Sequence, residues 1–344
     1  MQDCRRILIT GGAGFIGVNF VRQLLADEPD VTVVNLDALT YAGNLASLAD
    51  CLQHPRHRFV RGNIGNSELV RHVIREHKID GIINFAAESH VDRSIAAPGV
   101  FVDTNVGGTL NLLAAAREAG VRRFLQVSTD EVYGSLGAEG FFTETTPLSP
   151  NSPYSASKAG ADHLVHAFHH TFGMDTVITR CSNNYGAYQF PEKLIPLMIK
   201  RALADEPLPV YGDGSNVRDW IHVSDHCRAI WAVFAKGAPG EVYNVGGNSE
   251  RTNLQVVKTI LALLDKPESL ISFVKDRLGH DLRYAIDASK MKEELGWTPQ
   301  VPFDEGIRRT IDWYLANGDW VAQVASGEYQ KYFEEMYGTR GAAE

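Results

Sequence analysis

Tyr154 and Lys158 are the residues whose types and spacing most clearly suggest chemistry. They stand four residues apart in the run YSASK, so on a helix the phenol and the ammonium group share one face. A tyrosine has a pKa near 10, and acting as a base near pH 7 requires a lowering of about three units, or about 4 kcal/mol. A lysine cation and a nicotinamide cation within about 6 Å could together supply this lowering. Because such a pair also occurs by chance on helical surfaces, its meaning depends on the surrounding segments.

Two adjacent acids, Asp130 and Glu131, follow Thr129 at the end of a predicted strand. In parallel sheets, ligands bind at the carboxyl ends of the strands. Dehydrogenation needs only a tyrosine, a lysine and a hydroxyl such as that of Thr129. Elimination of water also needs a base for an acidified C–H proton and an acid for the departing hydroxyl. The two acids could do both, and the alternative is a helix N-cap pair without chemistry.

A glycine-rich turn follows the first predicted strand. Gly11, Gly14 and Gly17 allow a tight turn, a close approach of the backbone to a pyrophosphate, and close packing of the next helix on the sheet. Asp37 ends the second predicted strand, where an acid binds the hydroxyls of an adenosine ribose. Its carboxylate would repel a 2′-phosphate, which favours NAD over NADP. The alternative role of Asp37 is to cap a turn.

Short apolar runs and helical patterns alternate through the first half of the chain. Because the runs are continuously apolar, they are typical of strands covered on both faces. We predict an α/β fold with a Rossmann-type doubly wound parallel sheet and a smaller, mixed α/β C-terminal lobe. The predicted strands are 5–10, 31–36, 58–60, 81–85, 123–128 and 176–180, and the predicted helices are 15–26, 67–76, 104–119 and 155–172.

The alternation loosens after about residue 183, where proline and glycine become frequent. We therefore expect a dinucleotide-binding domain over residues 1–183 and a substrate-binding lobe made mainly of residues 184–344. The segment 221–247 is expected to return to the first domain.

Composition excludes several other classes of protein. The 344 residues carry a net charge of −9, which indicates no general affinity for nucleic acid or for anionic membranes. No apolar run approaches the ~18 residues of a membrane span, and no signal-peptide pattern is present. The four cysteines form no C-x-x-C pair, so we expect reduced thiols and a cytoplasmic location.

Four histidines crowd one predicted helix, and His166 and His170 have the spacing of a metal-binding pair. Since no acidic third ligand is evident, we predict no metal site. We expect this face of the helix to be solvated or to lie in a dimer interface.

The chain resembles the dTDP-glucose 4,6-dehydratases, a nucleotide-sugar branch of the extended short-chain dehydrogenase/reductase superfamily. The glycine spacing G-x-x-G-x-x-G and the Tyr-x-x-x-Lys pair are typical of that superfamily. The resemblance covers roughly residues 5–315. Its most specific stretches are 36–43 (LDALTYAG), 86–94 (AAESHVDRS), 128–134 (STDEVYG), 183–196 (NNYGAYQFPEKLIP), 211–220 (YGDGSNVRDW) and 276–281 (DRLGHD).

The resemblance implies a homodimeric enzyme with tightly held NAD that forms a 4-keto-6-deoxy sugar. Tyr154 would take the proton of the sugar 4-hydroxyl, with Thr129 orienting that oxygen, while C4 passes a hydride to NAD. Glu131 would then take the C5 proton and Asp130 would protonate the C6 hydroxyl, which leaves as water. The hydride would finally return to C6.

The resemblance also implies binding residues, taken position by position. The positions for the cofactor are Gly11, Gly14, Phe15, Ile16, Gly17, Asp37, Thr40, Asn63, Ile64, Ala86, Thr104, Tyr154, Lys158 and Asn184. Those for the nucleotide sugar are Ser89, Thr129, Asn183, Lys193, Leu194, Tyr211, Arg218, Asn253, Arg277 and His280. Lys193, Arg218 and Arg277 would supply the local positive charge that a diphosphate needs on an acidic protein.

The sequence departs from the family pattern at three positions. Asn63 replaces an aspartate near the adenine, and Ala187 and Leu278 replace prolines in substrate loops. None of them is a predicted catalytic residue.

Two kinds of alternative function remain open. The first is a sister enzyme, such as a UDP-sugar 4,6-dehydratase, an epimerase or a decarboxylase. Epimerases and decarboxylases usually have small or hydroxyl residues, or a single glutamate, at the Asp130-Glu131 position. The second is a non-catalytic NAD-binding regulator, which typically lacks the tyrosine or the lysine. The sequence does not distinguish thymine from uracil, because one methyl group contributes only ~1–3 kcal/mol of discrimination.

Overall fold

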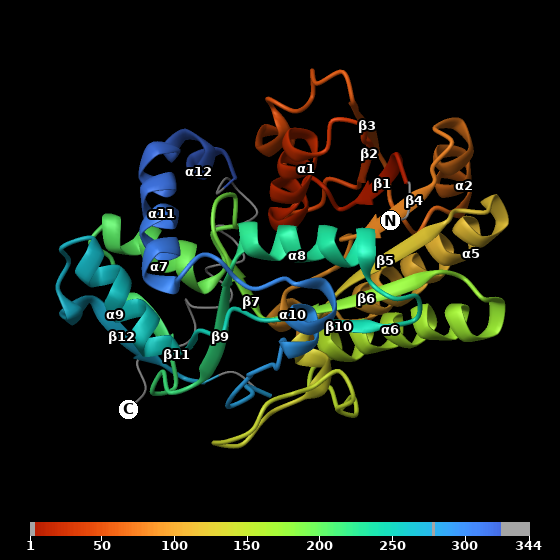
Figure 1. The fold of residues 1–344 in the computed structure, drawn as a ribbon. Coiled ribbons are helices and arrows are strands. Elements are labelled where there is room, and N and C mark those ends of the chain that lie inside the picture. Colours follow the sequence, from red (N-terminus) through yellow and green to blue (C-terminus); the bar gives the residue numbers. More distant parts are fainter. Residues whose placement is uncertain (1–3, 277–278, 325–344) are drawn as a thin grey trace.

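A seven-stranded sheet organises the larger part of the molecule (Figure 1). The computed structural model describes residues 4–276 and 279–324. The strand order is β10-β6-β5-β4-β1-β2-β3, and every neighbouring pair is parallel. The doubly wound parallel sheet expected from the sequence is thereby confirmed. Its strands are β1 (Arg6–Thr10), β2 (Thr32–Asp37), β3 (His57–Arg61), β4 (Gly81–Asn84), β5 (Arg123–Thr129), β6 (Thr176–Cys181) and β10 (Val242–Val245).

Helices cover both faces of this sheet, which explains why its strands are apolar on both sides. Successive residues of β1 enter different cores: Ile7 and Ile9 pack with the first face, and Leu8 packs with the second. The first face is covered by α1 (Phe15–Asp27) and α8 (Val223–Lys236), and the second by α2 (Ser67–Glu76), α5 (Thr109–Ala119) and α6 (Pro153–Phe172).

The helix predicted over residues 104–119 is only partly correct. The structure has a short helix α4 (Pro98–Phe101), then a π-helical stretch η2 (Val102–Gly108), and only then α5. Gly108 is packed so closely on Ile64 that an added Cβ would lie 2.5 Å from its Cδ1. Widened π turns are common next to functional sites, and a periodicity of 3.6 residues does not reveal them.

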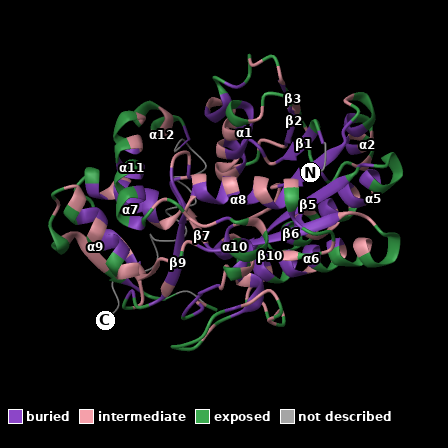
Figure 2. Cartoon of the chain, viewed as in Figure 1, coloured by how far each residue is buried: buried purple, intermediate pink, exposed green. Residues whose placement is uncertain are grey.

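The smaller, mixed α/β lobe has its own core (Figure 2). In its three-stranded sheet, β9 pairs antiparallel with β11 and parallel with β7, while β12 and β8 form a parallel pair. The strands are β7 (Asn183–Tyr185), β8 (Leu208–Tyr211), β9 (Val217–His222), β11 (Glu250–Thr252) and β12 (Ile271–Val274). The main helices are α7 (Leu194–Leu203), α9 (Asn253–Leu263), α11 (Phe303–Ala316) and α12 (Gly318–Val324).

The chain crosses between the two parts more than once. After β7, β8 and β9, helix α8 packs on the main sheet and β10 joins its edge beside β6. The domain boundary at residue 183 stays a prediction. The remaining short elements are α3 (Val91–Ala96), α10 (Ser289–Leu295), η1 (Leu45–Leu48), η3 (Asp130–Tyr133) and η4 (Glu268–Leu270).

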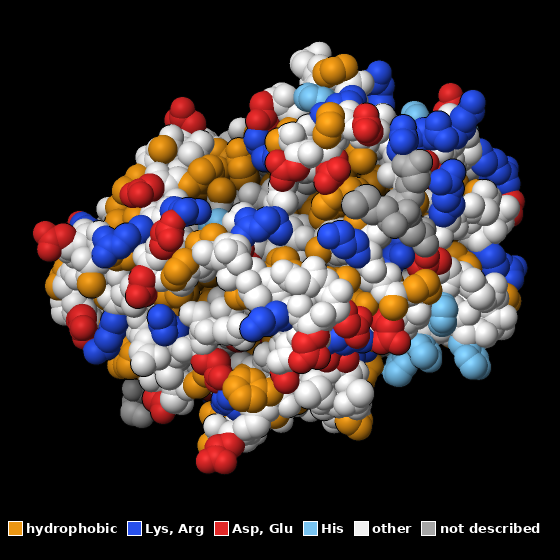
Figure 3. Space-filling model, viewed as in Figure 1, with side chains coloured by type: hydrophobic (Ala, Val, Ile, Leu, Met, Phe, Trp, Pro, Cys, Tyr) orange, Lys and Arg blue, Asp and Glu red, His pale blue; other side chains and the backbone are white. Residues whose placement is uncertain are grey.

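The histidines of α6 gather at one edge of the molecule (Figure 3). The rings of His166 and His170 are stacked with their centroids 6.5 Å apart, and His169 Nδ1 lies 2.8 Å from the carbonyl oxygen of Met174. In the described ranges, no helix combines the length and the apolarity needed to cross a membrane.

Candidate active site

A cavity of about 430 Å³ lies at the carboxyl edge of the main sheet. Every predicted cofactor residue lines it: Gly11, Gly14, Phe15, Ile16, Gly17, Asp37, Thr40, Asn63, Ile64, Ala86, Thr104, Tyr154, Lys158 and Asn184. So do the predicted catalytic residues Thr129, Asp130, Glu131, Tyr154 and Lys158. The fold thus brings eight separate segments of the chain to one site.

The glycine turn needs its glycines for steric reasons. Gly11 has a φ of +71°, and a Cβ there would lie 2.7 Å from the backbone nitrogen of Ala86. A Cβ on Gly17 would lie 2.3 Å from the carbonyl oxygen of Gly11. Helix α1 begins just after this turn, and no side chain of the described residues caps its first turn. The free N–H groups of a helix start suit a phosphate.

The position of Asp37 is compatible with both predicted roles, capping the turn and binding the hydroxyls of a ribose. Its Oδ2 accepts a hydrogen bond from the Ala13 amide (2.9 Å) and its Oδ1 from the Leu39 amide (2.8 Å), so the carboxylate caps the turn. Burial raises the pKa of Asp37. Each carboxylate oxygen can accept a further bond, so ribose hydroxyls still fit at the face that lines the cavity.

Tyr154 and Lys158 lie one turn apart at the start of α6. The start of the helix is fixed by Ser152 and Ser155, which cap each other's backbone reciprocally. Both catalytic candidates are buried, with 8% and 4% of their surfaces exposed. Lys158 Nζ donates to the carbonyl oxygen of Val127 at 2.7 Å, which anchors the lysine to β5.

The protein's own groups keep Tyr154 protonated. Burial raises its pKa well above the usual value, and the charge of the Glu131 carboxylate adds to this, while the nearby Thr129 hydroxyl opposes it. Burial also lowers the pKa of Lys158. The lowering expected for a tyrosine base is therefore not produced by the chain alone.

Asp130 and Glu131 begin η3 directly after β5. Thr129 Oγ1 accepts from the Glu131 amide at 3.3 Å and lies 3.3 Å from Asp130 Oδ1. Asp130 is only 1% exposed, and its Oδ2 has no hydrogen-bond partner among the described residues. Burial, then the charges of Glu131 and Asp219, raise the pKa of Asp130 well above its usual value. A carboxyl in this setting holds a proton that it can donate.

The predicted substrate residues divide into two groups. Ser89, Thr129, Asn183 and Lys193 line the cavity, whereas Leu194, Tyr211, Arg218, Asn253 and His280 are not part of its wall. Arg277 lies outside the described residues. Among the second group, the Tyr211 ring lies 6.0 Å from that of His280, and Arg218 lies close enough to Asp130 to affect its pKa.

Several lining residues were not predicted from the sequence. They include Glu88, Cys181, Ser182, Gln189, Phe190 and Glu192. Most stand inside the family-like stretches 86–94 and 183–196, which is the signal that could have identified them.

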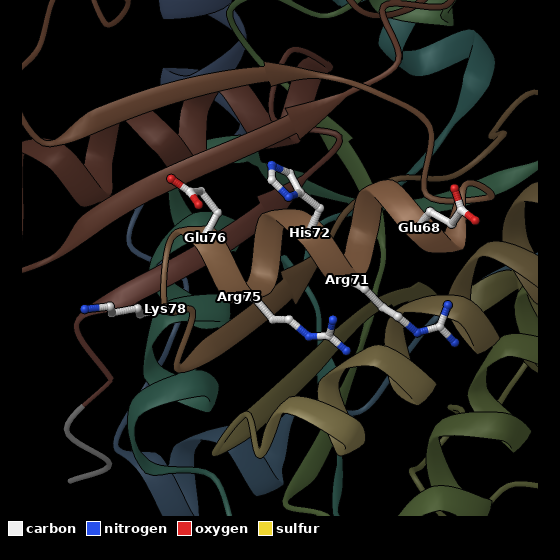
Figure 4. Close-up of a pocket in the computed structure, with 6 residues that line it drawn as sticks. All are labelled: Glu68, Arg71, His72, Arg75, Glu76 and Lys78. Atoms are coloured by element: carbon white, nitrogen blue, oxygen red, sulfur yellow. The ribbon is translucent and has the colours of Figure 1, made fainter.

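A second hollow, on α2, is lined by charged side chains and a histidine (Figure 4). It is lined by Glu68, Arg71, His72, Arg75, Glu76 and Lys78, and Arg71 and Arg75 point toward α5. There both arginines form ion pairs with Glu118, with Arg71 Nε 2.9 Å from its Oε2. Because both of its arginines are paired and it lies away from the carboxyl ends of the strands, this hollow is a solvated helix face.

The fold, the glycine turn and the Tyr154–Lys158 pair together define a short-chain dehydrogenase/reductase of the extended type. A family model described as GDP-mannose 4,6 dehydratase matches residues 8–310. A dTDP-glucose 4,6-dehydratase of Xanthomonas campestris is 61% identical, over 94% of this chain and 97% of that protein.

Solved structures agree with this similarity. DesIV, a dTDP-glucose 4,6-dehydratase from Streptomyces venezuelae crystallised with NAD and TYD bound, is 53% identical with a TM-score of 0.90, over 93% of this chain and 99% of that chain. A UDP-glucose 4-epimerase from Thermotoga maritima is 28% identical with a TM-score of 0.84, over 90% and 99% of the two chains. The chain therefore belongs to the nucleotide-sugar dehydratases, and among them to the dTDP-glucose 4,6-dehydratase family.

Proposed function

We propose that this chain catalyses the NAD-dependent conversion of dTDP-glucose into dTDP-4-keto-6-deoxy-glucose, as a hydro-lyase. The observation that carries this proposal is that two pairs of reactive side chains line the same cavity. Tyr154 and Lys158 equip it for oxidation, and the adjacent acids Asp130 and Glu131 equip it for loss of water. The similarity to dTDP-glucose 4,6-dehydratases over nearly the whole chain supports the same activity.

The cavity fits NAD. The glycine turn offers an uncapped helix start to a pyrophosphate, and Asp37 offers carboxylate oxygens to ribose hydroxyls. The chemistry that NAD supplies when bound is hydride storage, taken from C4 of the sugar and returned to C6. Since it is regenerated in each cycle, it serves as a held cofactor rather than a co-substrate.

Tyr154 takes the proton of the sugar 4-hydroxyl, and Thr129 orients that oxygen. Burial and the neighbouring carboxyls raise the pKa of Tyr154, so its action as a base needs positive charge close to the phenol. Lys158 and a cationic nicotinamide ring would provide this charge. Lys158 is held for the task by its hydrogen bond to Val127.

Glu131 and Asp130 divide the elimination between them. The ketone at C4 acidifies the C5 proton, which Glu131 takes. Asp130 retains its own proton because it is buried beside other negative charges, and it delivers that proton to the C6 hydroxyl, which leaves as water. Glu131 then returns its proton to C5 as the hydride goes back to C6. The proton that Tyr154 took from the 4-hydroxyl is released to solvent, and Asp130 takes one up, which restores both groups for the next cycle.

We assign the nucleotide sugar to the side of the cavity that faces the smaller lobe. Ser89, Asn183 and Lys193 are the wall residues proposed to contact it. Lys193 Nζ donates to the carbonyl oxygen of Ser89 at 3.0 Å, which places its charge at the wall. Leu194, Tyr211, Arg218, Asn253, Arg277 and His280 are proposed to hold the nucleoside diphosphate beyond that wall.

The test is to incubate the purified protein with dTDP-glucose, without added NAD. We expect the alkaline absorbance of a 4-keto sugar and, by mass spectrometry, the loss of one water. Tyr154→Phe should lower the rate by about 10²- to 10⁴-fold. If only UDP- or CDP-sugars react, or if the product retains its water as in epimerisation, the proposed activity is wrong.

The proposal includes a homodimer in the cytoplasm. Val102 of η2, Leu110 of α5 and Phe172 of α6 are 52%, 42% and 47% exposed, and apolar side chains of this kind suit a contact with a second copy. All four cysteines are buried and free, which suits a reducing compartment.

A further inference from the structure

A group of four side chains lies at the wall of the cavity, with two members lining it and two behind them. It consists of Tyr41, Arg93, Phe190 and Glu192, and we call it the Tyr41 clamp. Tyr41 follows β2, Arg93 belongs to α3, and the other two follow β7. The group therefore joins two loops and a short helix that are far apart in the sequence.

Tyr41 is the centre of these contacts. The guanidinium carbon of Arg93 lies 3.8 Å from the centre of the Tyr41 ring, the shortest cation–π distance among the described residues. The ring of Phe190 meets Tyr41 edge-on, with the ring centres 6.0 Å apart and an angle of 83°. The side chain of Ser89, a residue of the cavity wall, lies close enough to the Tyr41 hydroxyl to lower its pKa, against the larger raising effect of burial.

Glu192 fixes Arg93 over the ring. Its carboxylate oxygen Oε2 lies 3.5 Å from Arg93 Nη2 and 3.9 Å from His90 Nε2. Only 2% of the Glu192 side chain is exposed, so this ion pair is poorly screened by water. The arginine is therefore held between an aromatic face and a buried carboxylate.

The clamp is connected directly to the cavity wall. Tyr41 does not line the cavity, but its neighbours Thr40 and Ala42 do, as do Phe190 and Glu192. Leu39, at the start of the Tyr41 loop, has a φ of +54°, a left-handed conformation that is unfavourable for a leucine. Contacts elsewhere must hold this loop in place, and the clamp provides them.

We propose that the Tyr41 clamp holds the loop over the cofactor closed, and that Arg93 and Tyr41 are positioning residues that slow the release of NAD. The proposal rests on the NAD-dependent cycle proposed above. In that cycle, the hydride removed from C4 must stay in the same active site until it is returned to C6. Release of the reduced cofactor in mid-cycle would leave an unfinished keto sugar, so slow release is a requirement of the chemistry.

The test measures the release of labelled NAD from the purified holoenzyme into an excess of unlabelled NAD. Arg93→Lys keeps the charge but loses the planar group that stacks, and Tyr41→Leu loses the ring. Both should release NAD at least tenfold faster than the unmodified protein. Tyr41→Phe keeps the ring and should stay within about threefold.

The matched control is Arg251→Lys. Arg251 also stacks on an aromatic ring, that of Phe303 at 4.9 Å, but it lies in the smaller lobe and does not line the cavity. Its NAD release should be unchanged. At saturating NAD, the kcat of Arg93→Lys should return to within threefold of the unmodified protein, because only cofactor retention is affected.

Unchanged NAD release in both Arg93→Lys and Tyr41→Leu would overturn the proposal. So would a kcat that stays low at saturating NAD, since Arg93 would then act on the reaction itself. If the unmodified protein held NAD but made no keto sugar, the proposed function would fail, while the release rates would still decide the clamp.

Discussion

The Asp130 carboxyl shows how burial could prepare a single residue for the role of general acid that we propose for it. It is 1% exposed beside Glu131 and Asp219, and its pKa is raised well above the usual value. Such a group binds its proton more tightly in the folded protein than in the unfolded chain. Its contribution to the free energy of unfolding is fully present below the unfolded pKa, near 3.9, and is lost as the pH rises through the folded pKa.

Asp130→Asn should therefore separate catalysis from stability. Its kcat should fall by about 10²- to 10⁴-fold, because an amide cannot donate the proton to the C6 hydroxyl. Its Tm relative to the unmodified protein should rise as the pH increases from about 4 to about 8, because the amide has no proton to lose. Thermal unfolding across this pH range and product formation measure the two effects.

Asp213→Asn is the control for this variant. Asp213 is exposed, and a hydrogen bond from Ser215 lowers its pKa, so its replacement should give no such gain at high pH. A Tm difference for Asp130→Asn that stays constant with pH would contradict the protonated, buried acid.

At the scale of an element, the glycine turn and helix α1 show how close packing constrains the sequence. Gly17 lies in the first turn of α1, against the carbonyl oxygen of Gly11 and the Cα of Gly12. The element can present its N–H groups to a pyrophosphate only while the helix packs this closely on the turn. Its sequence is therefore constrained by contact distances as well as by helix propensity.

Gly17→Ala should displace the turn, because the added Cβ would lie 2.3 Å from Gly11 O and 2.7 Å from Gly12 Cα. We expect a loss of about 1–3 kcal/mol in the free energy of unfolding and a clear drop in the NAD content of the purified protein. Denaturant unfolding and chromatography of the released nucleotide would measure these losses.

Gly99→Ala is the matched substitution in another helix. No described atom lies within 4 Å of its added Cβ, so it should be neutral or should stabilise by about 0.5–1 kcal/mol, with its NAD content intact. Equal behaviour of the two alanine variants would show that the turn does not need the close contact.

At the scale of the whole molecule, the main sheet and the smaller lobe meet at one cavity, and an exposed helical surface is the place where we propose that a second copy binds. The cavity takes its walls from the carboxyl edge of the main sheet and from the segment that begins the smaller lobe. On the outer side of the molecule, α5 and α6 expose Leu110 and Phe172. Near Phe172, Arg117 stacks on the ring at 4.1 Å, which adds a cation to this surface.

Leu110→Glu should weaken the proposed homodimer. A charge buried in an apolar contact loses its hydration without gaining a partner, so the dimer dissociation constant should rise by tenfold or more. Sedimentation or light scattering over a range of concentrations would detect this. Leu315→Glu on α11, at a position 54% exposed, should leave the mass unchanged. A monomeric unmodified protein would remove the basis of the prediction.

Six of the seven main-sheet strands, all except β10, could be predicted from the sequence because their patterns are local, as could α1, α2 and α6. The predicted helix over 67–76 matches α2, and the predicted ends of the others fall within a few residues, apart from the helix that begins in a π-helical stretch. The grouping of Tyr154, Lys158, Asp130 and Glu131 was expected, because the carboxyl ends of parallel strands meet at one edge.

Other features of the site could not be predicted in this way. Both oxygens of Asp37 accept backbone hydrogen bonds, which depends on where Ala13 and Leu39 lie after folding. The stacking of Arg93 on Tyr41 joins residues that are separated by four elements, η1, β3, α2 and β4. No local pattern contains such a contact.

The sequence by itself determined the alternation of strands and helices, the glycine-rich turn and the types of the proposed catalytic groups, because periodicity, glycine spacing and side-chain chemistry act over a few residues. Only the tertiary structure decided which predicted substrate residues line the cavity, how the loop beside Asp37 is held, and in which direction the pKa values of Tyr154 and Asp130 move. These properties depend on burial and on charges brought together from distant segments. They arise only when the chain has folded and water has been excluded.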